Sequence, residues 1–163
     1  MKVVLFIGSE SDLDVIKGAL KVFEEFEISF SLEVTSAHRS PERTKRLILE
    51  SEEQGVQVFI CVAGKAAHLA GVVASHTVCP VIGVPVGGSD LDGMDALLSI
   101  VQMPKGVPVA CMGIGKHGAI NAALLAVQIL SLKDESLCEK YKKYKTKMAE
   151  SVEASSNKIK ELL

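Results

Sequence analysis

Tryptophan is absent from this sequence and other aromatic residues are rare, which argues against several classes of protein. Only two of the 163 residues are Tyr and five are Phe, and the formal net charge is −2 at pH 7. A nucleic-acid-binding surface needs an excess of Lys and Arg, often with aromatic rings on which bases stack. A membrane protein needs apolar runs of about 20 residues with aromatic belts at their ends. We therefore expect no nucleic-acid partner and no membrane association.

Cysteine pairs are also lacking. The four cysteines are spread along the chain without a C-x-x-C motif, and Cys61, Cys79 and Cys111 lie inside apolar runs. Isolated thiols in such runs are typical of buried free cysteines in a reducing compartment. The apolar run at residues 3–7 is too short for the hydrophobic region of a signal peptide. These features predict a cytoplasmic protein.

Hydrophobic residues are plentiful, at 48% of the chain, and they follow a repeating order. Five apolar, β-branched runs are each followed by a turn containing Gly or Ser and then by a stretch compatible with a helix. The runs cover residues 3–7, 28–34, 56–62, 81–86 and 107–112, and the helical stretches cover residues 12–26, 41–54, 66–75, 92–101 and 119–130. Nearly continuous hydrophobicity predicts strands covered on both faces. The pattern therefore predicts an α/β domain with a parallel sheet of about five strands between two layers of helices.

The last 30 residues differ from the rest, because apolar side chains recur there at helical spacing among many Lys and Glu residues. We expect one long helix over about residues 134–161. Its apolar stripe can pack on the domain itself or on a neighbouring subunit, and we favour the subunit. No internal repeat or linker is present, so we expect residues 1–163 to form a single domain.

The first strand is followed by Gly8-Ser9-Glu10-Ser11-Asp12, at the start of a predicted helix. In open α/β sheets, ligands bind beyond the carboxyl ends of the strands. Hydroxyls and free N–H groups at a helix start favour an anion such as phosphate. The alternative is that Ser11 or Asp12 only caps the helix.

Two further loops carry groups suited to a phosphorylated substrate. His38 and Arg39 follow the second run, and Lys65 and His68 follow the third. A guanidinium can bind phosphate with two hydrogen bonds, and imidazole can exchange protons near neutral pH. The small residues around Lys65 leave room for a flat ligand. The alternative for His38 is a hydrogen-bonded surface histidine without a catalytic role.

Residues 113–118 match the G-x-G-x-x-G pattern of dinucleotide-binding proteins. The match follows the last strand rather than the first, and the acidic residues about twenty positions later begin a helix instead of ending a strand, which argues against a dinucleotide. The four histidines have no i, i+4 pair, and Asp90, Asp92 and Asp95 lack the spacing of a calcium loop. These patterns argue against a bound dinucleotide and against a metal site.

Several of these motifs occur together in one known family. The segments Gly8-Ser9-Glu10-Ser11-Asp12, Ser36-Ala37-His38-Arg39, Ala63-Gly64-Lys65-Ala66-Ala67-His68-Leu69 and Leu98-Ser99-Ile100-Val101-Gln102-Met103-Pro104 resemble the PurE family, the phosphoribosylaminoimidazole carboxylases of de novo purine synthesis. The resemblance implies a flavodoxin-like three-layer αβα sandwich. It also implies a homo-oligomer, an octamer or a tetramer, with active sites at subunit boundaries. The implied substrate is an aminoimidazole ribonucleotide, with no metal or organic cofactor.

The resemblance also implies roles for single residues. Ser9, Ser11, Ser36 and Arg39 would bind the 5′-phosphate, and Asp12 would bind the ribose hydroxyls. Gly64, Lys65 and Ala67 would contact the imidazole and its carboxylate. His38 would act as the acid and base, with His68 orienting the substrate or relaying the proton.

The family has two branches with different chemistry. Carboxylases add CO2 to carbon C4 of aminoimidazole ribonucleotide (AIR), giving the 4-carboxy nucleotide (CAIR), whereas mutases move a carboxyl group to C4 from the exocyclic nitrogen. Lys65, Ala70 and His117 depart from the typical mutase sequence. From these departures we expect a carboxylase. The alternatives are an N5-carboxyaminoimidazole ribonucleotide mutase, in which Lys65 is a tolerated substitution, and a non-catalytic nucleotide-binding module.

Overall fold

The computed structural model describes residues 1–162, which contain one parallel five-stranded sheet with the order β2-β1-β3-β4-β5. The strands are β1 (Val3–Ile7), β2 (Phe30–Val34), β3 (Val58–Gly64), β4 (Val81–Val86) and β5 (Ala110–Cys111). The helices are η1 (Glu10–Asp12), α1 (Leu13–Glu25), α2 (Pro41–Glu53), α3 (Leu69–His76), α4 (Met94–Val101), α5 (Lys116–Ser131) and α6 (Glu135–Lys160). This arrangement confirms the predicted flavodoxin-like α/β fold.

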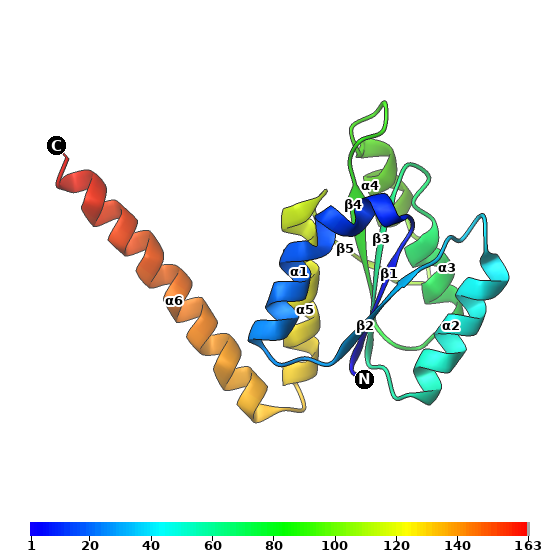
Figure 1. Ribbon diagram of the computed structural model, residues 1–163, viewed down its shortest axis with the longest axis horizontal. Helices are drawn as coiled ribbons and strands as arrows, with labels where there is room; N and C mark the ends of the chain where they lie inside the picture. Colours follow the sequence, from blue (N-terminus) through cyan, green and yellow to red (C-terminus); the bar gives the residue numbers. More distant parts are fainter. Residues whose placement is uncertain (163) are drawn as a thin grey trace. The chain divides into compact units, whose positions relative to one another are not determined.

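Helices cover both faces of the sheet (Figure 1). α1 and the first turns of α5 lie on one face, whereas α2, α3 and α4 lie on the other. The contact between α1 and α5 is close, since a Cβ atom on Gly18 would lie 2.7 Å from Cγ1 of Ile120. All residues of β1 and β4, and all but the last of β3, are buried. This burial explains the nearly continuous hydrophobicity of these strands.

β2 and β3 begin later than predicted because backbone N–H groups before them still hydrogen-bond to the preceding helix. After α1, Glu27 adopts a left-handed conformation with φ of 57°, and its N–H donates to Glu24 O while that of Ile28 donates to Phe23 O. These bonds form a Schellman motif, in which glycine normally occupies the left-handed position. Gly55 takes that position after α2. Ile28 and Val56 therefore end helices instead of starting strands.

The last strand is much shorter than predicted. The run at residues 107–112 yields only Ala110–Cys111, which pair in parallel with Ile82 and Gly83 of β4. Val107 donates its N–H to Pro104 in a turn, and Pro108 has no N–H to give to the sheet. The residues before Ala110 therefore cannot extend the strand.

The chain divides into two compact units, one spanning Met1–Ala126 and the other beginning at Val127. The first unit contains the whole sheet. The second contains α6, whose N-terminus is capped by Asp134, because its carboxylate accepts the N–H of Leu137 at 3.1 Å. The long C-terminal helix is thus confirmed within a residue or two of its predicted bounds. The single domain over residues 1–163 stays a prediction.

The four cysteines are all free thiols. Cys61 on β3 is fully buried, and burial raises the pKa of its thiol far above the ordinary value. The other three are only half-buried. The prediction of buried thiols therefore holds for Cys61 alone. In the described part of the chain, none of the helices combines the length and the apolar character needed to cross a membrane.

Candidate active site

A pocket of about 570 Å³ opens at the carboxyl edge of the sheet, where the loops after β1, β2, β3 and β4 meet. The strand order changes direction at β1, because β2 pairs with one side of β1 and β3 pairs with the other. Such a change of direction separates neighbouring loops and leaves a crevice between them. The pocket lies in the first compact unit.

The loop after β1 presents two hydroxyl groups to the pocket. Ser9 Oγ accepts the N–H of Ser11 at 3.3 Å and its hydroxyl at 3.0 Å, so Ser9 caps the short turn η1. Asp12 precedes α1 but makes no capping hydrogen bond with its side chain. Ser9, Ser11 and Asp12 all line the pocket. The alternative that Ser11 or Asp12 only caps the helix is therefore wrong.

Asp12 is the one acidic residue among those that line the pocket. Its side chain is buried, and the residue is 9% exposed. Burial raises the pKa of Asp12, and hydrogen bonds from the Ser9 backbone and the Ser11 side chain partly offset this effect. The carboxylate thus sits where it can accept hydrogen bonds from ligand hydroxyls, at a cost to the folded protein.

The loop after β2 is tied directly to the loop after β1. The Arg39 guanidinium donates from Nη2 to Gly8 O at 3.0 Å. Ser36 Oγ accepts from the backbone N–H of Arg39 at 3.2 Å and from its Nε at 3.5 Å. Arg39 therefore spans two loops, and its charge lies beside the hydroxyls of the first loop. This grouping suits a dianionic phosphate.

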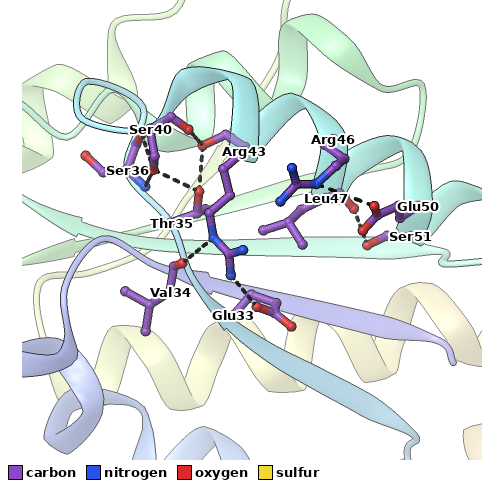
Figure 2. A network of polar contacts seen from close by, with 11 residues as sticks. Glu33, Val34, Thr35, Ser36, Ser40, Arg43, Arg46, Leu47, Glu50 and Ser51 are labelled. Atoms are coloured by element: carbon purple, nitrogen blue, oxygen red, sulfur yellow. Dashed lines mark hydrogen bonds and ion pairs between the residues drawn. The ribbon is translucent and has the colours of Figure 1, made fainter.

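Buried hydroxyls hold the loop after β2 in place (Figure 2). Thr44 on α2 donates its hydroxyl to Ser40 O at 3.2 Å, so the 2.7 Å contact between Thr35 Oγ1 and Thr44 Oγ1 uses the Thr35 proton. Ser40 Oγ donates to Ser36 O at 3.2 Å and accepts the N–H of Ser36 at 3.1 Å. Thr35 and Thr44 are 2% and 0% exposed. These hydrogen bonds to α2 and to Ser40 just before it thus hold the backbone around His38 in place.

Two histidines from different loops meet in the pocket. His38 Nε2 lies 2.8 Å from His68 Nδ1, and the rings meet edge to face at 76°. A hydrogen bond between two imidazole nitrogens needs one donor and one acceptor, so the pair shares one proton at this contact. The pair joins the loop after β2 to the loop after β3. The catalytic role of His38 and the alternative of a hydrogen-bonded surface histidine both fit this contact, so the catalytic role stays a prediction.

The loop after β3 carries the remaining predicted residues, and only some of them line the pocket. Gly64 and Lys65 line the pocket, whereas Ala67 does not. Ala67 is 1% exposed, and its side chain belongs to the hydrophobic core. The Ala67 side chain therefore does not face the pocket, and the predicted contact of Ala67 with the ligand stays a prediction. Lys65 has φ of 56°, in the left-handed region that favours glycine.

The loop after β4 also reaches the pocket, through Gly87, Gly88 and Ser89. Ser89 Oγ donates to the Asp95 carboxylate at 2.8 Å and accepts the N–H groups of Leu91 and Gly93, so its hydroxyl shapes the loop. None of these three was assigned to the site from sequence. The sequence signal that could have identified them is the Gly87-Gly88 pair directly after the buried strand β4.

The G-x-G-x-x-G segment after β5 lies outside the residues that line the pocket. A Cβ atom on Gly118 would lie 2.6 Å from the carbonyl carbon of Gly113. Close packing of the loop against α5 therefore explains this glycine without a dinucleotide. Within residues 1–162, no three His, Cys, Asp or Glu side chains are placed to hold a metal ion.

The comparisons with known proteins point to one family. The sequence profile of the family described as AIR carboxylase matches residues 2–151. The chain is 54% identical over 147 residues to N5-carboxyaminoimidazole ribonucleotide mutase from Pyrococcus abyssi, covering 90% of this chain and 83% of the relative. It is 49% identical over 160 residues to the protein of the same name from Methanocaldococcus jannaschii, covering 98% of both.

A relative with a different name is also similar. The chain is 44% identical over 158 residues to phosphoribosylaminoimidazole carboxylase from Candida glabrata, covering 97% of this chain but only 27% of that longer protein. Among solved structures, PurE from Treponema denticola superposes with a TM-score of 0.88 at 27% identity, covering 97% of this chain and 98% of that one. The chain therefore belongs to the AIR carboxylase family, the PurE enzymes of purine biosynthesis.

Proposed function

We propose that this enzyme is an N5-carboxyaminoimidazole ribonucleotide mutase, which moves the carboxyl group from the exocyclic nitrogen to C4 of the imidazole. The observation that carries the proposal is the similarity over almost the whole chain to relatives with that name, at 54% and 49% identity. This replaces the sequence-based preference for direct carboxylation of AIR.

The structure gives little support to the three differences from the typical mutase sequence that favoured a carboxylase. Ala70 is 1% exposed and packs in the hydrophobic core, and His117 is exposed but does not line the pocket. Only Lys65 of the three reaches the pocket. Two of the three differences therefore have no direct route to the chemistry.

The reaction is an isomerisation, and its atoms balance within the substrate. The bond between the exocyclic nitrogen and the carboxyl carbon breaks, and the same carbon forms a bond to C4. The proton on C4 leaves, and one proton returns to the nitrogen. The enzyme therefore needs a group that accepts a proton at one atom and supplies a proton at another.

The His38–His68 pair suits this need. Imidazole exchanges protons near neutral pH, and two hydrogen-bonded rings can hold the proton on either side of their contact. We assign His38 the role of acid and base and His68 the role of its partner. Arg39, Ser9, Ser11 and Ser36 would bind the phosphate, because they gather donors at one end of the pocket.

Asp12 would accept hydrogen bonds from the ribose hydroxyls beside that phosphate. The nucleotide would then lie with its phosphate at the donors of the first two loops and its imidazole at the His38–His68 pair. No residue in this scheme requires a metal ion or an organic cofactor. CO2 formed by cleavage of the nitrogen–carbon bond would stay in the pocket until C4 attacks it.

Direct carboxylation is the second candidate, favoured by the cationic Lys65 in the pocket and by the name of the Candida glabrata relative. Purified protein is given N5-carboxyaminoimidazole ribonucleotide in one assay and AIR with bicarbonate in the other. We expect efficient conversion of the first substrate and slow conversion of the second. Rapid conversion of AIR that depends on CO2 alone would reverse the assignment, and binding without either conversion would indicate a non-catalytic module.

A histidine variant tests the proposed base. His38→Asn should lower kcat by roughly 10²- to 10⁴-fold and leave the Kd for CAIR within a few-fold. His76→Asn is the matched control, since His76 is an exposed histidine at the end of α3 outside the pocket. It should leave both constants unchanged. Turnover retained in His38→Asn would contradict the role of His38.

We also propose that the chain assembles into a homo-oligomer. Support comes from α4, where Met94, Leu98 and Val101 are 50%, 51% and 49% exposed at helical spacing. This apolar stripe follows the loop that lines the pocket, in keeping with a site at a subunit boundary. Sedimentation should give a multiple of 17.4 kDa, and Leu98→Glu should lower the mass. A monomer at micromolar concentration would contradict the assembly.

A further inference from the structure

Lys65 combines a strained backbone with a charged side chain in the pocket. Its φ of 56° is left-handed, a conformation that destabilises residues with a Cβ atom relative to glycine. Two other non-glycine residues, Glu27 and Asp92, share this feature, but neither lines the pocket. Strain retained at a ligand site indicates that the side chain has a function there.

The ammonium group of Lys65 has no partner within residues 1–162. No hydrogen bond or ion pair of the described chain involves it. The nearby cation Arg39, by contrast, already donates to Gly8 O and Ser36 Oγ. Lys65 is therefore free to pair with an anion that enters the pocket.

The position of Lys65 identifies which anion this is. The hydroxyls of Ser9, Ser11 and Ser36 gather with Arg39 at the loops after β1 and β2, and this group accounts for the phosphate. Lys65 follows β3, three residues before His68 and its contact with His38. A second anionic group of the ligand would therefore lie beside the histidine pair, where the carboxyl group reacts.

We propose that Lys65 is a specificity-determining residue whose ammonium binds the carboxylate of the nucleotide, so that carboxylated nucleotides bind more tightly than AIR. The proposal rests on the proposed function, since it takes an aminoimidazole ribonucleotide as the ligand. It also assigns Lys65 a role that a mutase can use, because substrate and product both carry the carboxylate. Lys65 then holds that group near C4 while the bond to nitrogen breaks.

Three variants separate the charge from the strain. Lys65→Met removes the charge and keeps the left-handed backbone under strain. Lys65→Gly removes both, and Lys65→Arg keeps both. Calorimetric titration measures the Kd for CAIR and for AIR, and thermal unfolding measures Tm. Glu27→Gly is the control outside the pocket, since Glu27 also has a left-handed backbone, with φ of 57°.

We expect Lys65→Met and Lys65→Gly to weaken CAIR binding about tenfold or more and to leave AIR binding within about twofold, as removal of a charged hydrogen bond requires. Lys65→Gly should also raise Tm by about 2–4 °C, because it relieves the left-handed strain, whereas Lys65→Met should not. Lys65→Arg should bind like the unaltered protein. Glu27→Gly should leave both Kd values unchanged.

Two results would overturn the proposal in distinguishable ways. If the unaltered protein binds CAIR and AIR but the Lys65 variants weaken both equally or neither, the role of Lys65 is wrong and the proposed function survives. If the unaltered protein binds neither nucleotide, the proposed function fails and this inference fails with it.

Discussion

Replacement of Gly118 by alanine should disrupt the start of α5. The new Cβ atom would lie 2.6 Å from the carbonyl carbon of Gly113, and still closer to its oxygen. Ordinary contact between such atoms is about 3.5–4 Å, so the loop and the helix must separate by about 1 Å or more. Both neighbours are backbone, which cannot rotate away as a side chain can. We expect a loss of about 3 kcal/mol or more, at the upper end of overpacking effects.

The assay is thermal and urea unfolding of Gly118→Ala beside Gly113→Ala. Gly113 belongs to the same turn, but nothing lies within 4 Å of its Cβ position. At about 2–4 °C per kcal/mol for a protein of this size, Gly118→Ala should lower Tm by about 6–12 °C. Gly113→Ala should change the stability by less than about 0.5 kcal/mol. Equal effects in the two variants would refute the packing explanation of this motif.

Three further predictions concern the pocket and its support. Thr44→Val leaves the buried Thr35 hydroxyl without its 2.7 Å partner and should lower the free energy of unfolding by about 1–3 kcal/mol in urea titrations. Thr146→Val is its control, because that exposed hydroxyl bonds only Lys142 O on α6, and a similar loss there would contradict the argument. Arg39→Ala should raise KM roughly 10- to 100-fold with a smaller change in kcat, whereas Arg43→Ala, which loses a pair with Glu33 outside the pocket, should leave KM unchanged. Equal KM values in the two arginine variants would exclude the phosphate role. For Asp12, burial raises the pKa in the folded protein, so the folded state binds more protons than the unfolded state as pH rises from about 3.9. The contribution of Asp12 to stability should therefore fall through that window, so the urea midpoint of Asp12→Asn should rise relative to that of the unaltered protein between pH 3 and pH 7. Parallel pH profiles of the two proteins would contradict this effect of Asp12.

The elements of the fold were predictable because their signals are local. Buried parallel strands give continuous apolar runs, and β1 and β4 match their predicted bounds. The predicted strand starts were wrong where backbone N–H groups hydrogen-bond to the preceding helix instead of to the sheet. Ile28 and Val56 look like strand residues in sequence, but their N–H groups close the preceding helices. That competition depends on the left-handed residue before each of them, and Glu27 gives no sequence signal for it.

The pocket was predictable in outline, since the carboxyl ends of parallel strands meet at one edge of a sheet. Its detail was not. The contact between His38 and His68 joins residues 30 positions apart and depends on the path of two loops. Ala67 and Lys65 differ by two positions, yet one faces the core and the other the pocket. The reaction branch was harder to predict from sequence, because the weight of Ala70 and His117 depends on where these residues lie, and neither lines the pocket.

The most direct test follows the carbon that is transferred. N5-carboxyaminoimidazole ribonucleotide labelled with ¹³C in its carboxyl group is converted by the purified enzyme in buffer containing unlabelled bicarbonate, and the product is read by NMR. A mutase that retains CO2 in its pocket predicts that the label appears at the C4 carboxylate without dilution. Product whose carboxylate carries carbon from bicarbonate would contradict the account and establish direct carboxylation.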